Sequence, residues 1–207
     1  MNGKTLSGTL KSISDLISVN RDYLIELDQQ NGDGDLGISM SAGFRAVADY
    51  LSGTEETDLG KLLMKCGSVF NEAAPSSLGT ILAMGMMGMA KVLKGKEDAS
   101  LSEIVLALEG GIRSIMEKAK SKPGEKTIMD ALCPAVKVLK NAAGSNESAA
   151  WEAAAQAATE GSESTRTMKP VHGRAAYYGE KSIGILDGGS VVGKLIFQGI
   201  CDYRSGA

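Results

Sequence analysis

The chain has 207 residues, of which 43% are hydrophobic, 23% charged and 4% aromatic, and its formal net charge is -3. This length allows one domain or two small ones with a sizeable core, and the composition is that of an ordinary globular protein. A mildly acidic chain with no basic cluster and few aromatic residues is poorly suited to following a phosphate backbone or stacking on bases, which argues against a nucleic-acid partner.

The cysteines and the apolar segments bear on the cellular compartment. Cys66, Cys133 and Cys201 are far apart and each lies in an apolar helical pattern, which predicts reduced core thiols rather than disulfides or zinc ligands. Residues 1–20 lack the apolar core of a signal peptide, and the longest apolar run, 78–90, is shorter than the ~20 residues that span a bilayer. We therefore expect a cytoplasmic protein with no membrane association.

The first predicted helix leads directly into an acidic loop. Apolar residues recur every three to four positions over 6–27, and the sequence LDQQNGDGDLG follows at 27–37. Asp28, Asp33 and Asp35 alternate there with glycines, so a tight loop with converging carboxylates is expected. Neither possible EF-hand register supplies the required Gly and Glu. The pattern therefore favours magnesium held together with substrate phosphates, and the alternative is a solvated loop without a ligand.

The second predicted helix, over residues 40–51, starts immediately after this loop. Its N-terminal amide groups should point back towards the carboxylates, an arrangement that favours a bound anion. Ser39 and Ser41 lie close to these amides, where capping of the helix and contact with a phosphate are both open.

A third helix, predicted over residues 62–73, ends at the sequence APSSLGT, residues 74–80. Ser76 and Ser77 could present hydroxyl and amide groups to a nucleotide, although a Pro-Ser-Ser start of a helix is common without any ligand. The fourth helix is predicted from this point to about residue 93.

The fifth helix begins at a capping box formed by Ser100 and Glu103 and extends to about Met116. A Pro-Gly turn, KSKPGEKT, then connects to a sixth helix over residues 129–139. Lys122 and Lys126 in this turn are expected to be solvated, and contact with a phosphate is the alternative.

A seventh, alanine-rich helix is predicted over residues 146–168, and a glycine-punctuated segment follows at 169–190. Long ordered connections in compact proteins are often functional. The lone histidine, His172, has no visible partner and is expected to be a surface residue. An eighth helix over about 192–203 closes the chain. The candidate functional residues of the segment are Arg174, Glu180, Lys181, Ser182 and Asp187.

Strand alternation is absent from the sequence, which predicts an all-α array of eight amphipathic, antiparallel helices. If neighbours are antiparallel, the connections after the first, third, fifth and seventh helices lie at one end. These are the acidic loop, the Ser-Ser loop, the Pro-Gly turn and the segment that carries Arg174. The acidic groups and the phosphate-contacting groups would then share one rim.

At these residues the sequence resembles the L subunit, or nucleotide-binding domain, of the dihydroxyacetone kinase family. The resemblance is carried by LDQQNGDGDLGISMSAGF, KPGEKTIMDALCPAV and GRAAYYGEKSIGILDGG. It implies a closed barrel of eight antiparallel helices in a single domain, residues 1–207, with ADP or ATP and two Mg²⁺ ions at one end. It places Asp28, Asp33 and Asp35 as metal ligands and Arg174 as the catalytic residue. The implied nucleotide contacts are Leu36, Gly37, Ile38, Ser39, Ser76, Ser77, Ala119, Ile128, Arg174, Asp187, Gly188 and Gly189.

The activity implied by this resemblance is phosphoryl transfer to a short ketose held on a separate K-type subunit. A phosphotransferase-type M protein is the implied phosphate donor that recharges the bound ADP. Leu36 stands where the family commonly has a histidine, the APSSLGT loop is short, and DGGS replaces the family's Asp-Pro-Gly-Ala. These departures motivate an alternative, a non-catalytic ADP-binding module that regulates a partner protein.

Overall fold

The computed structural model describes residues 1–142 and 146–206. Within these ranges the chain forms nine α-helices and two short 3-10 helices, η1 and η2. Apolar residues spaced for a helical stripe supply the buried face of each long helix. The elements are α1 (Gly3–Val19), α2 (Arg21–Gln29), α3 (Leu36–Ser52), α4 (Leu59–Ala73), α5 (Ser77–Val92), α6 (Leu101–Ala119), α7 (Met129–Asn141), α8 (Glu147–Ser164), η1 (Thr165–Thr167), η2 (Arg174–Ser182) and α9 (Gly188–Ser205).

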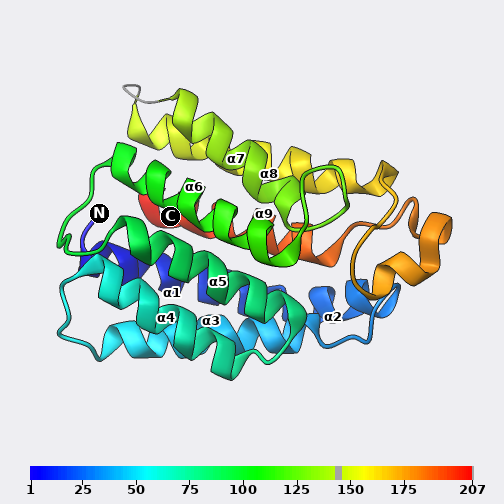
Figure 1. Cartoon of the computed structure of the whole chain (residues 1–207), viewed down its shortest axis with the longest axis horizontal. Coiled ribbons are helices and arrows are strands. Elements are labelled where there is room, and N and C mark those ends of the chain that lie inside the picture. Colours follow the sequence, from blue (N-terminus) through cyan, green and yellow to red (C-terminus); the bar gives the residue numbers. More distant parts are fainter. Residues whose placement is uncertain (143–145, 207) are drawn as a thin grey trace.

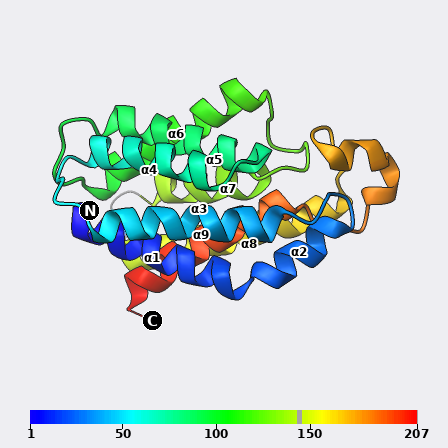
Figure 2. The same cartoon turned by 90° about the horizontal axis from the view of Figure 1, so that it is seen from below.

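Eight of the helices form a closed ring. Helix α1 packs against α3, each helix from α3 to α8 packs against the next one in the chain, and α9 packs against α1 (Figures 1 and 2). Helices that follow one another through short connections run antiparallel around this ring. The predicted all-α barrel of eight antiparallel helices is therefore confirmed. Helix α2 extends beyond the ring at one end (Figure 2).

The single helix predicted over residues 6–27 is wrong, because the chain breaks at Asn20 between α1 and α2. The side chain of Asn20 donates a hydrogen bond to the carbonyl of Leu16 at 2.8 Å. Such local bonds compete with the helical ladder and favour its termination. The break lies between Ile17 and Leu24, which are seven positions apart, so the apolar spacing appeared continuous. Helix α1 belongs to the barrel, whereas α2 leads into the acidic loop.

The four connections predicted to gather at one end do so. The loops α2–α3, α4–α5 and α6–α7 and the segment α8–α9 all lie at the end of the barrel that is on the right in Figure 1. The segment before α9 extends beyond the barrel end and folds back to it. This arrangement brings residues from four distant parts of the sequence to one rim.

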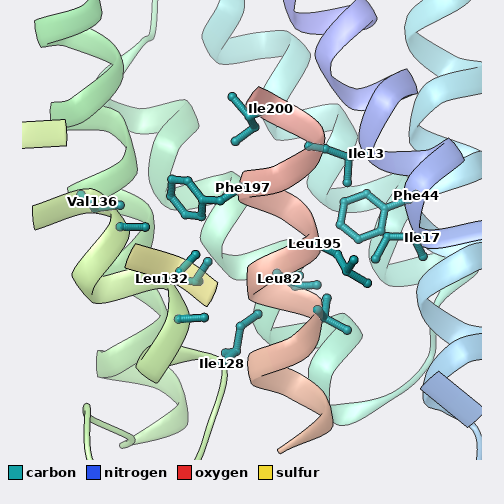
Figure 3. Packing of buried hydrophobic residues seen from close by; sticks show 14 of the residues in the cluster. Ile13, Ile17, Phe44, Leu82, Ile128, Leu132, Val136, Leu195, Phe197 and Ile200 are labelled. Carbon is teal, nitrogen blue, oxygen red and sulfur yellow. The ribbon is translucent and has the colours of Figure 1, made fainter. Parts of the chain in front are cut away.

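The core of the barrel is built from buried apolar side chains that every ring helix contributes. In Figure 3, Phe197 and Ile200 of α9 lie between Ile13 of α1 on one side and Val136 of α7 on the other. Phe44 and Phe70 meet edge to face with ring centroids 4.9 Å apart. The three cysteines are free thiols, as predicted, although Cys133 is only half-buried.

In the described part of the chain, no helix combines the length and the apolar character that crossing a membrane requires.

Candidate active site

Three carboxylates converge where α2 ends and α3 begins. Asp28 lies in the last turn of α2, Asp33 in the connecting loop, and Asp35 immediately before α3. One oxygen from each carboxylate lies within 4.8 Å of the others; Asp28 is half-buried, and the other two are exposed. Gly32 permits this approach, because a Cβ atom at that position would lie 2.2 Å from Oδ1 of Asp28. Such a set of oxygen ligands suits Mg²⁺, which keeps water and phosphate oxygens in its shell.

The charges of this cluster are only partly balanced by the protein. The pKa of the Asp35 carboxyl is raised, mainly because the surrounding protein partly desolvates it and secondly because Asp33 and Asp28 repel it. The positive charge of Arg174 opposes this rise. The Nη2 atom of Arg174 lies 2.6 Å from Oδ2 of Asp33, and both side chains are largely exposed. A divalent cation would relieve the same repulsion. The three carboxylates therefore fit a metal ion, with one guanidinium beside it.

The positive ends of four helices face this rim, since α3, α5, α7 and α9 all begin there (Figure 1). Helix α5 is capped by Ser76, whose Oγ accepts from the Gly79 N–H at 3.1 Å. By contrast, the side chain of Asp35 makes no capping hydrogen bond to α3. The first amide groups of α3, residues 36–38, are therefore available to an anion beside the carboxylates.

Ser39, Ser76 and Ser77 lie near the rim, whereas Ser41 contacts a neighbouring helix. The Ser76 hydroxyl donates to Oγ of Ser39 at 3.4 Å, and Ser39 in turn donates to the Leu36 carbonyl at 3.2 Å, so the acidic loop and the Ser-Ser loop meet. Ser41 is buried and its Oγ lies 3.4 Å from that of Ser18, so it joins α3 to α1 away from the rim. Ser77 is exposed at the first position of α5.

The Pro-Gly turn is organised by residues that the sequence did not single out as functional. Asp130 accepts from the N–H groups of Gly124 and Thr127 at 2.5 and 2.7 Å, one to each carboxylate oxygen. Glu125 lies 2.7 Å from Nε2 of His172, and this hydrogen bond holds the pKa of the Glu125 carboxyl below its usual value. The expectation that His172 has no partner is wrong. It is half-buried and connects the Arg174 segment to the turn.

Four of the predicted nucleotide contacts meet where α3, α7 and α9 begin. A Cβ atom on Gly188 would lie 2.5 Å from the Leu36 side chain, and one on Gly189 would lie 3.4 Å from the Ile128 nitrogen. Leu36 and Ile128 are both buried, so the side chains pack and the backbone is the part that faces the rim. Asp187 caps α9 by accepting from the Ser190 N–H at 2.6 Å. Burial raises the pKa of Asp187 to about 7.

Other predicted contacts lie differently. Gly37 packs against α2, since a Cβ atom there would lie 2.1 Å from the Arg21 carbonyl oxygen. Ile38 is 51% exposed on the outside of α3, and Ala119 is half-buried at the last position of α6. The expectation that Lys126 is solvated is wrong, because the residue is only 3% exposed, and no feature of the sequence indicated this burial.

Known proteins resemble the chain over most of its length. The model of the DAK2 domain matches residues 30–202. The chain is 31% identical, over 87% of each sequence, to the PEP-dependent dihydroxyacetone kinase, ADP-binding subunit DhaL, of Escherichia coli (strain K12). It is 33% identical to the corresponding subunit of kinase 2 from Listeria innocua, covering 87% of this chain and 85% of the relative.

Larger proteins share the fold over part of their length. The crystal structure of the dihydroxyacetone kinase of C. freundii matches 98% of this chain and 34% of its own, with a TM-score of 0.78 and 22% identity. The same kinase in complex with AMP-PNP and Mg²⁺ gives a TM-score of 0.77 at 23% identity, covering 95% of this chain and 33% of its own. These structures share the helical barrel.

Proposed function

The chain belongs to the DAK2 domain family, and from this we propose that it is the Mg²⁺-dependent, nucleotide-binding subunit of a kinase for dihydroxyacetone or a similar short ketose. The observation that carries the proposal is the cluster of Asp28, Asp33 and Asp35, with Arg174 2.6 Å from Asp33, beside the uncapped start of α3. The relatives named as ADP-binding subunits support the choice of nucleotide. The AMP-PNP and Mg²⁺ complex of the C. freundii kinase supports the choice of metal.

Each group at the rim has a role in this proposal. Asp28, Asp33 and Asp35 hold Mg²⁺ as ligands, two ions in the fully loaded site, and act as neither general acid nor general base. When bound, Mg²⁺ supplies positive charge to the phosphate oxygens. The amide groups of α3 orient the phosphates through their dipoles. The residues assigned to nucleotide contact are Leu36, Gly37, Ile38, Ser39, Ser76, Ser77, Ala119, Ile128, Asp187, Gly188 and Gly189.

Arg174 is the proposed catalytic residue. A guanidinium presents several N–H donors in one plane, so it can offset negative charge on the transferring phosphoryl group. Its present partner is Asp33, which is one of the proposed metal ligands. Its position beside the carboxylates supports this role, because the terminal phosphate is expected next to the proposed metal ligands.

A separate protein is proposed to carry the ketose. The cavity inside the barrel has a volume of about 150 Å³ and an almost entirely apolar lining, including Leu6, Phe44 and Phe197, which does not suit a polyhydroxylated sugar. The hollow at the rim, lined by Gly32, Arg174, Tyr177 and Tyr178, is open to solvent. We therefore assign the sugar to a K-type subunit that docks at the rim, and the recharging of ADP to a phosphotransferase-type M protein.

The proposal is tested by mixing the purified chain with a K-type subunit, a short ketose and a phosphorylated M protein. The expected result is a phosphorylated ketose, with labelled phosphate passing through the bound ADP. Asp33→Ala should abolish retention of ADP and Mg²⁺ while the helical circular dichroism is unchanged. Asp49→Ala, which removes an exposed carboxylate from α3, the helix that follows the acidic loop, is the matched control. Retention of ADP by Asp33→Ala would show that the metal ligands are misassigned.

The alternative function is a regulatory module that holds ADP without turning it over. The observation that favours it is Leu36, whose apolar side chain is buried against Gly188 at the centre of the rim and offers no polar atom to a reacting group. This alternative expects tight retention of ADP and no exchange of phosphate with any donor. Incorporation of labelled phosphate into the bound nucleotide would exclude it.

A further inference from the structure

The segment that carries Arg174 is held to the barrel by few apolar contacts. Several of its large side chains are turned to solvent: Tyr177 is 92% exposed, and Val171 and Ile183 are each more than half exposed. Its regular structure is the 3-10 helix η2, which is kinked at Gly179. Burial of apolar surface therefore contributes little to the position of Arg174, and polar contacts must hold the segment.

Three of these polar contacts come from one buried residue, Lys126 in the Pro-Gly turn. The residue is 3% exposed, and its ammonium group donates to the carbonyls of Ser182 and Ile185 at 2.7 Å each and of Met168 at 3.3 Å. An ammonium has three donors and no acceptor, so these three carbonyls satisfy it completely. No ion pair found among the described residues involves Lys126.

The three carbonyls lie on both sides of Arg174 in the sequence. Met168 precedes Arg174, and Ser182 and Ile185 follow it, so the one buried ammonium group joins the two parts of the chain that flank the arginine. The conformation of the Pro-Gly turn directs the Lys126 ammonium group towards these carbonyls. Lys126 has a φ of 59°, which a residue with a side chain rarely adopts, and Asp130 holds the turn by accepting from Gly124 and Thr127. Such backbone conformations persist where the surrounding structure enforces them, often near functional sites.

We propose that Lys126 is a positioning residue, whose buried ammonium fixes the segment 168–185 so that Arg174 faces the carboxylate cluster. The catalytic consequence rests on the proposed function, whereas the hold on the segment does not. A neutral side chain of the same length cannot replace it, because the carbonyls of Met168 and Ile185 would lose their donor and the buried Ser182 carbonyl would keep only the Ile185 N–H, 3.2 Å away.

The first test measures the segment itself. Trypsin can cleave after Arg174 and Lys181, both of which are exposed. Lys126→Met should accelerate cleavage at these two sites by about tenfold or more, since loss of even one hydrogen bond to a charged group has that effect. The matched control is Lys137→Met, which removes an exposed lysine from α7 and should leave cleavage unchanged. Equal cleavage of Lys126→Met and the unmodified protein would overturn the proposal.

A second measurement does not depend on a variant that folds. In the unmodified protein, acetic anhydride should modify Lys126 at least about tenfold more slowly than Lys137, as judged by peptide mass spectrometry, because reaction requires local opening. Equal rates would overturn the proposal.

A third measurement separates positioning from general destabilisation. If phosphoryl transfer is observed, Lys126→Met and Arg174→Ala should each lower its rate, and the double variant should be no slower than Arg174→Ala alone. Additive losses would show that Lys126 does not act through Arg174. If the unmodified protein transfers no phosphate, the proposed function fails, but the cleavage and labelling results still decide whether Lys126 holds the segment.

Discussion

Carboxylates at the two ends of the barrel are placed in opposite electrostatic settings. At the end away from the rim, Glu103 accepts from the Lys96 ammonium at 2.7 Å and from the Ser100 backbone at 2.8 Å, which lowers its pKa to about 2. Asp98 is bonded to the N-terminal ammonium of Met1 at 2.9 Å, and its pKa is also lowered. Each of these acids has a partner for its negative charge.

At the rim, the pKa values of Asp35 and Asp187 are raised instead. Burial is the first cause in both cases, and neighbouring carboxylates add to it. Ionised Glu103 and Asp98 therefore stabilise the fold, whereas ionised Asp35 and Asp187 destabilise it until a cation or another ligand offsets their charge. The difference separates structural acids from acids arranged for binding.

The largest effect is expected from neutralising one member of the cluster. Asp35→Asn should weaken Mg²⁺ affinity in the presence of ADP by at least about 100-fold, because it removes a charged ligand. In metal-free buffer the same variant should be at least as stable as the unmodified protein, because a repulsion is removed. Titration calorimetry and thermal melting measure the two effects, with Asp49→Asn as control. Unchanged Mg²⁺ affinity would contradict the assignment of this carboxylate as a ligand.

The next largest effect concerns Asp187 and pH. Its pKa is about 7 in the folded protein against 3.8 ordinarily, so the unfolded chain releases the proton first, and stability should fall as pH rises from about 4 to 7. The loss is at most about 4 kcal/mol. Asp187→Asn can still cap α9, so it should melt several degrees higher at pH 8 and show a smaller difference near pH 4. If the melting temperatures of Asp187→Asn and the unmodified protein changed equally with pH, the raised pKa of Asp187 would be contradicted.

The smallest effect is expected at the opposite end. The pKa of Glu103 is lowered from 4.5 to about 2, so the stability it contributes is present above pH 4.5 and is lost as pH falls towards 2. Glu103→Gln should therefore lower the melting temperature at pH 7, and the difference from the unmodified protein should shrink as the solution is acidified. If the difference in melting temperature grew on acidification instead, the conclusion that ionised Glu103 stabilises the fold would be wrong.

Local structure was largely predictable from the sequence. The capping box of Ser100 and Glu103 is present as expected, because a cap depends on residues three positions apart. Helical periodicity located the barrel helices, and the alternation of Asp and Gly indicated converging carboxylates. Antiparallel connection of consecutive helices then placed the four functional segments at one end. The failure at Asn20 was also local, since a side-chain bond to Leu16 ended a helix whose apolar spacing continued.

The sequence by itself therefore determined most of the helices, the end at which four of their connections gather, and the acidic loop, because these depend on neighbouring residues and short connections. Only the tertiary structure decided how the rim is held together. Lys126 bonds to carbonyls up to 59 positions away, and His172 meets Glu125 across 47 positions. No periodicity or spacing encodes such contacts. They arise because α7 packs against both α8 and α9, which brings the turn before α7 next to the segment before α9, and because the left-handed backbone at Lys126 turns an expected surface lysine inward.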